Sequence, residues 1–134
     1  MLKKTVIPCI CAILTATTAE AAITTDVLGK DSRECVAYAR SRVPSLPYNL
    51  WTYADKKKIK NSSSCKKGSV AIINTGDSVG HVAVVEDCDS SGSSQSITVT
   101  ETNWKRGNKT QRTSKTSKVS KSESELNIYG YFKP

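Results

Sequence analysis

Four side chains have the types that catalysis by a cysteine nucleophile requires: Cys35, His81, Glu101 and Asn103. A histidine can take the proton of a thiol and later give it to the leaving group. A carboxylate or an amide bonded to the ring then holds the imidazole in its working orientation. The chain has one histidine, and a lone histidine is more often structural than catalytic. The interpretation therefore depends on the elements that position these residues.

The residues before Cys35 predict the start of a helix. Either Asp31 or Ser32 can cap a helix that runs to about Arg42, and Asp31 with Glu34 has the spacing of a capping box. Cys35 then lies in the first turn, where the helix dipole favours a thiolate. A backbone N–H of that turn, such as that of Cys35 itself, could help to bind an oxyanion.

Residues 96–103 predict a strand that carries the acid and the amide. Side chains alternate between the two faces of a strand, so four residues share the core side: Ile97, Val99, Glu101 and Asn103. The threonines at 98, 100 and 102 should face solvent. A buried carboxylate needs partners, and His81 begins a strand that could lie alongside. We expect Glu101 to be the direct partner of His81.

The N-terminal residues 1–21 have the layout of a secretory signal peptide. Two lysines precede an apolar stretch, and cleavage is expected near Ala21 or Ala22. The stretch is too short to span a hydrocarbon core of about 30 Å. We therefore expect residues 22–134 to form a single exported domain, periplasmic or extracellular. The full chain has a formal net charge of +8, which favours acidic partners.

Two of the five cysteines fall in the predicted signal peptide, which leaves an odd number in the mature chain. Residues 69–74 and 81–87 predict the strands of a hairpin. Its register, centred between residues 76 and 77, brings Cys65 beside Cys88 at a separation that a disulfide can bridge. Cys35 is then the free thiol.

The remaining elements are weaker predictions. Residues 23–28 form a short leader. Leu50 to Lys58 predicts a second helix, with Trp51 and Ala54 inward and the three lysines at 56–58 in solvent. The basic tract Lys105 to Lys121 predicts loop and strand, and Leu126 to Phe132 a final strand. Helices followed by an antiparallel sheet indicate an α+β fold.

Six segments together resemble one family: ECVAYARSR, LWTYADK, KKGSVAII, GHVAVVE, TVTETNW and IYGYFKP. The family is CHAP, the cysteine, histidine-dependent amidohydrolases and peptidases, and the resemblance spans about Asp31 to Pro134. It implies an α+β, papain-like fold of the NlpC/P60 type, with N-terminal helices packed on a small antiparallel β-sheet.

The resemblance also implies roles for individual residues. Cys35 would be the nucleophile and His81 the general base and acid, with Glu101 or Asn103 as the orienting group. Trp104 and Trp51 match family aromatics that line the substrate groove, although core packing is an equal alternative for Trp51.

Glu34 departs from the family pattern, which often has Gln before the cysteine. Gln can assist the oxyanion, whereas an ionised Glu has no hydrogen to donate. The departure shifts this work to backbone groups.

The function implied by the resemblance is cleavage of amide bonds in peptidoglycan, either as an N-acetylmuramoyl-L-alanine amidase or as an endopeptidase. No cofactor or metal is expected. Peptidoglycan and anionic wall polymers would be the partners of a monomeric enzyme. A non-catalytic wall-binding module, or an antibacterial toxin with an immunity protein, are the alternatives. Nucleic acid is not expected as a partner, because aromatic residues are too sparse in the basic tract.

Overall fold

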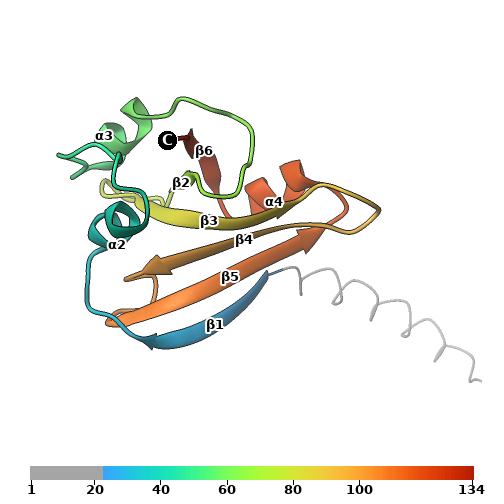
Figure 1. Ribbon diagram of the computed structural model, residues 1–134, viewed down its shortest axis with the longest axis horizontal. Coiled ribbons are helices and arrows are strands. Elements are labelled where there is room, and N and C mark those ends of the chain that lie inside the picture. The colour runs from blue at the N-terminus through green and yellow to red at the C-terminus, as the bar shows by residue number, and fades with distance from the viewer. Residues whose placement is uncertain (1–22) are drawn as a thin grey trace, which may run out of the picture.

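The computed structural model describes residues 23–134, which form one six-stranded antiparallel sheet with three short helices (Figure 1). The strand order is β1-β5-β4-β3-β2-β6. The strands are β1 (Ile23–Lys30), β2 (Val70–Ile73), β3 (His81–Asp89), β4 (Gln95–Thr102), β5 (Asn108–Thr116) and β6 (Ile128–Phe132), and the helices are α2 (Cys35–Arg42), α3 (Tyr53–Lys58) and α4 (Val119–Glu125). The predicted signal peptide, residues 1–21, lies outside the described residues. Within residues 23–134, no helix is long and apolar enough to cross a membrane.

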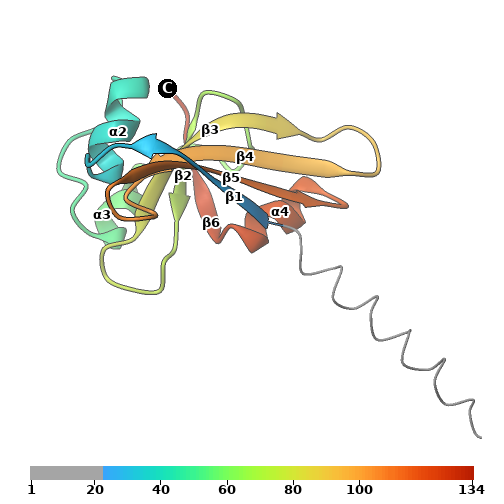
Figure 2. The ribbon, with the colours of Figure 1, turned by 90° about the horizontal axis from the view of Figure 1, so that it is seen from below.

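One helix packs on each face of the sheet, α2 on one side and α4 on the other (Figure 2). Apolar side chains of the central strands point to both faces. One cluster joins α2 to alternate residues of the central strands: Val70, Val82 and Val84. The cluster on the other face contains the intervening residues, together with Leu126 at the end of α4 and Tyr131 of β6. Continuous apolar runs in β2 and β3 therefore reflect burial on both faces.

The α+β class is as expected, but the order of elements is only partly so. The predicted leader is part of β1, an edge strand paired with β5. The basic tract forms β5 and the beginning of α4. Since α4 lies between β5 and β6, the helices are not all N-terminal. Pairing with β4 on one side and β1 on the other gives β5 the backbone partners that its polar composition did not reveal.

The β2–β3 hairpin has a register one residue away from the predicted one, because Val70 pairs with Val84 and Ile73 with His81. The turn is therefore centred on Asp77. Cys65 and Cys88 nevertheless form a disulfide, with their Cα atoms 6.1 Å apart. Cys65 precedes the paired part of β2, in a loop that absorbs the one-residue difference.

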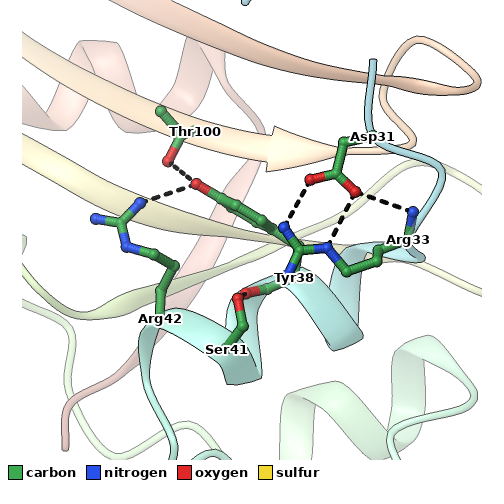
Figure 3. Close-up of polar contacts among 6 residues, drawn as sticks. All are labelled: Asp31, Arg33, Tyr38, Ser41, Arg42 and Thr100. Atoms are coloured by element: carbon green, nitrogen blue, oxygen red, sulfur yellow. Dashed lines mark hydrogen bonds and ion pairs between the residues drawn. The ribbon is translucent and has the colours of Figure 1, made fainter. Parts of the chain in front are cut away.

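The helix that carries Cys35 is fastened to the sheet through Tyr38 (Figure 3). The buried phenol hydroxyl hydrogen bonds with Thr100 Oγ1 of β4 at 2.9 Å and accepts a bond from Arg42 at 2.8 Å. Arg42 also forms an ion pair with Glu86 of β3. Thr100 was expected in solvent, but it is buried, and its hydroxyl bonds with Tyr38 and Glu86.

The predicted capping of this helix by Asp31 or Ser32 is wrong. The helix begins at Cys35 with Glu34 as its N-cap, and no side chain makes a capping hydrogen bond there. The carboxylate of Asp31 instead accepts bonds from the backbone and guanidinium of Arg33 (Figure 3). The ion pair thus takes the acceptor that a capping box would have used.

Helix α3 is shorter than predicted and faces the other way. It begins after Thr52, whose side chain forms a capping box with Asp55. Trp51 is 71% exposed and Ala54 is also exposed, whereas Lys56 is buried. The Lys56 ammonium donates to the carbonyl of Val79 at 2.7 Å, and this bond explains how a lysine is accommodated in the interior.

We predict that replacing both disulfide cysteines, Cys65→Ala with Cys88→Ala, lowers the free energy of unfolding by about 3 kcal/mol. The bridge closes a loop with a sequence separation of 23 residues, and both side chains pack against the core. Urea denaturation under non-reducing conditions measures the change. Cys35→Ala is the matched control and should change the stability by less than about 1 kcal/mol. Equal stability of the double variant and the unmodified chain would contradict the prediction.

Candidate active site

Cys35 and His81 lie close together because the helix that begins with Cys35 packs against the strand that begins with His81. Cys35 is the first residue of α2, and His81 is the first residue of β3, against which α2 packs. The His81 ring lies beside the Cys35 thiol, and the ring and the backbone of Val82 both lower the pKa of that thiol. Both residues line a cavity of about 660 Å³. The thiol therefore has a base beside it and access from the cavity.

The other side of the His81 ring faces Glu101. His81 Nε2 lies 3.0 Å from Glu101 Oε1, and both side chains are buried. Because Nε2 is engaged by the carboxylate, Nδ1 is the nitrogen left for the Cys35 sulfur. The arrangement is the one expected from the sequence, with Glu101 rather than Asn103 as the direct partner.

Glu101 is fully buried and receives three further bonds from β5. Arg112 Nε donates to Oε2 at 2.8 Å, and Arg112 Nη2 donates to Oε1 at 2.9 Å. Thr110 adds a weaker bond to Oε2 at 3.4 Å. In the β4–β5 register, Glu101 is opposite Thr110 and Val99 is opposite Arg112, so all four share one face.

Arg112 was missed in the sequence because it lies within the basic tract. The feature that distinguishes it is its place on the strand: Thr110, Arg112 and Ser114 are buried and alternate with more exposed residues along β5. An arginine at an inward position, on a strand next to a buried glutamate, was the partner that Glu101 required.

These contacts change the proton affinities of all three groups. Burial alone would raise the pKa of the Cys35 thiol, but the hydrogen bond and charge of His81 hold it below its ordinary value. Burial would lower the pKa of His81, yet its bonds with Cys35 and Glu101 raise it. Burial would raise the pKa of Glu101, but first Arg112 and then His81 lower it. Together these shifts favour a thiolate–imidazolium pair beside an ionised carboxylate.

The loop before His81 is held by Asp77 and by a close backbone approach. Asp77 Oδ1 accepts bonds from the N–H groups of Val79 and Gly80 at 2.9 and 3.0 Å. Gly80 has φ +69°, and a Cβ at this position would be 2.8 Å from Cδ1 of Tyr53. Only glycine fits here, so α3 can pack closely against the residue that precedes the histidine.

Asn103 does not share the buried face with Glu101, and that prediction is wrong. β4 ends at Thr102, which is itself buried rather than solvent-facing. Asn103 follows with φ +63° and is exposed. Its backbone N–H donates to Asn108 across the β4–β5 turn, and this reversal takes the side chain out of the strand alternation. Asn103 still lines the cavity.

Comparison with protein families identifies the family of this chain. A family model described as CHAP domain matches residues 26–103, more than half of the chain. The chain belongs to the CHAP family. Comparisons with curated proteins and with solved structures find no match. Family membership implies a papain-like fold, and the matched region includes Cys35, His81 and Glu101 but ends before Arg112.

Three further residues discussed from the sequence of this CHAP domain, Glu34, Trp51 and Trp104, all line the cavity. Trp51 is therefore a cavity wall rather than a core residue. The Trp104 ring is 5.3 Å from the His81 ring and tilted against it. Lys56, a second residue missed in the sequence, also lines the cavity and contributes positive charge that lowers the pKa of Cys35. Among residues 23–134, no cluster of three or more His, Cys, Asp or Glu side chains could hold a metal ion.

We predict that Cys35 reacts with iodoacetamide at a pH below the ordinary cysteine range of about 8.5, because its pKa is lowered. His81→Ala removes the bond and charge that lower this pKa while burial remains. The midpoint of the alkylation rate against pH should therefore move above that of the unmodified protein. Intact-mass spectrometry follows the adduct, and Cys35→Ala controls for labelling elsewhere. An unchanged midpoint in His81→Ala would show that the ring does not activate the thiol.

Proposed function

We propose that this CHAP protein is a secreted peptidoglycan hydrolase that cleaves amide bonds of the wall peptide with Cys35 as the nucleophile. The observation that supports it most strongly is the continuous contact from the Cys35 thiol through His81 to the buried Glu101, at the wall of an accessible cavity. CHAP domains in general suggest peptidoglycan amidase or peptidase activity. A binding module without catalysis would not need these side chains aligned.

The first half of the reaction transfers an acyl group to the enzyme. The Cys35 thiolate attacks the carbonyl carbon of the scissile amide, and a tetrahedral oxyanion forms. Protonated His81 gives its proton to the amide nitrogen as the C–N bond breaks, so the amine departs neutral. Glu101 holds the ring throughout by its bond to Nε2. The product on the enzyme is a thioester.

The second half returns the enzyme to its starting state. Neutral His81 takes a proton from water, and the hydroxide attacks the thioester carbonyl. The C–S bond breaks, the carboxylic acid is released and gives its proton to solvent, and the thiolate–imidazolium pair forms again.

The oxyanion is stabilised by backbone groups at the start of α2. The first N–H groups of a helix have no partner within the helix, and Cys35 is the first residue of this one. Glu34, which also lines the cavity, has only acceptors when ionised. These features support stabilisation of the oxyanion by backbone N–H groups.

The size, lining and charge of the region around the Cys35 thiol support a peptidoglycan substrate. The cavity has the size of pockets that hold small organic ligands or short peptides. Its wall includes exposed aromatic surface from Tyr48, Trp51 and Trp104. The net charge of +8 favours approach to anionic wall polymers, in a salt-dependent manner. Export through the predicted signal peptide would bring the enzyme to this polymer.

We predict that Cys35→Ala reduces the rate of turbidity loss of purified sacculi by on the order of 10³-fold or more, since the nucleophile is removed. The circular dichroism spectrum should be unchanged. The double variant Cys65→Ala with Cys88→Ala is the matched control: it loses two cysteines outside the cavity and should retain lysis at temperatures where it is folded. Full lysis by Cys35→Ala would exclude this residue as the nucleophile.

Mass spectrometry of the released muropeptides identifies the bond. A new amino group on L-alanine indicates the N-acetylmuramoyl-L-alanine amidase, whereas split stem or cross-bridge peptides indicate the endopeptidase. Release of neither product by the unmodified protein would overturn the proposed function.

A further inference from the structure

Arg112 contacts both groups that hold the His81 ring. Its guanidinium makes two bonds to Glu101, one to each carboxylate oxygen. Its central carbon also lies 3.6 Å from the centre of the Trp104 ring, a stacked cation–π contact. Trp104 in turn packs against His81. One side chain of β5 thus fixes the hydrogen-bond acceptor of the histidine and the aromatic ring beside it.

The charges of Cys35, His81 and Glu101 sum to zero only when Arg112 is included. Glu101 and Arg112 form one buried ion pair, with both side chains at most 5% exposed. The Cys35 thiolate and the His81 imidazolium form a second pair next to it. Without Arg112, two anions would share one cation in the interior. A buried net charge is very unfavourable, so the site would then take up a proton.

We propose that Arg112 is a positioning residue of the hydrolase site: it fixes Glu101 and Trp104 around His81 and supplies the positive charge that allows Cys35 to exist as a thiolate. The catalytic part of this inference rests on the proposed function. The charge balance itself can be tested without any peptidoglycan.

Other charged groups face the site but do not replace Arg112. Lys56 of α3 lies on the cavity side, with its ammonium bonded to the carbonyl of Val79. Arg40 of α2 donates to the carbonyls of Leu46 and Pro47. Glu34 before α2 and Asp77 in the loop before β3 are the acids of the cavity wall. The hydrogen bonds to Glu101 come from three side chains, those of His81, Thr110 and Arg112, and Arg112 is the permanent cation among them.

The test compares Arg112→Met with Arg112→Lys. Methionine keeps an unbranched apolar stem but removes the charge, so the pH midpoint of Cys35 alkylation by iodoacetamide should rise by about one unit or more. This corresponds to an approximately tenfold smaller thiolate fraction at a pH below both midpoints. Lysine keeps the charge but cannot form the two-bond fork or stack as a plane. Its midpoint should stay within about 0.3 units of the unmodified protein, a small part of a full charge effect.

The lysine variant also separates geometry from charge in catalysis. On sacculi, Arg112→Lys should lower kcat by about tenfold with little change in KM, because His81 is less well held while the cavity wall is kept. Lys115→Met removes an exposed charge from the same strand and is the matched control, with an unchanged alkylation midpoint.

The outcomes are decisive in each arm. An unchanged midpoint in folded Arg112→Met overturns the role of the charge. If that variant does not fold, Arg112→Lys carries the test, and full activity in it overturns the positioning role. A midpoint shift in Arg112→Met, in a protein that releases no muropeptides, would support the inference while contradicting the proposed substrate.

Discussion

The carboxylate of Glu101 is shielded from water, so it must either meet donors or lose its charge. The register between β4 and β5 satisfies this constraint by placing Thr110 opposite it and Arg112 diagonally across. With two donors from Arg112 in place, the carboxylate stays ionised and offers an oxygen to His81 Nε2. The orientation of the only histidine, and through it the state of the Cys35 thiol, depends on this buried ion pair.

Helices α2 and α3 fix the positions of Cys35 and His81 relative to the sheet. Tyr38 fixes α2 to β4 through Thr100, and β4 is the strand that carries Glu101. Cys35 and Glu101 are therefore both linked to β4, although 66 positions separate them in the sequence. On the other side, α3 presses against Gly80, directly before the histidine. Cys35, His81 and Glu101 are thus each held by an element with few alternative positions, which is the condition for a preorganised site.

The sequence predicted the chemistry of the site better than its surroundings. Cys35, His81 and Glu101 could be found because few residue types can serve as nucleophile, base and orienting acid, and the disulfide followed from the hairpin. Asn103 was misplaced because period-two alternation does not show where a strand ends. Asn103 itself has a left-handed backbone conformation and follows the last residue of β4. Trp51 was predicted to be buried and Lys56 exposed, and the structure shows the reverse. A six-residue helix has too few turns for the sequence to reveal which face is buried. Arg112 was hidden by composition: among many lysines, only its position opposite a buried acid distinguishes it.

The single histidine permits a direct test of the central claim, because every imidazole signal in the described domain belongs to His81. We would label the histidine with ¹⁵N and follow both ring nitrogens by NMR as the pH is raised. The account predicts a ring that stays doubly protonated above the ordinary histidine value of about 6.5, with a hydrogen-bonded Nε2 proton, because Cys35 and Glu101 raise its pKa. Cys35→Ala should lower that pKa. A ring that titrates at the ordinary value and is unaffected by Cys35→Ala would contradict the thiolate–imidazolium pair, and with it the activated nucleophile.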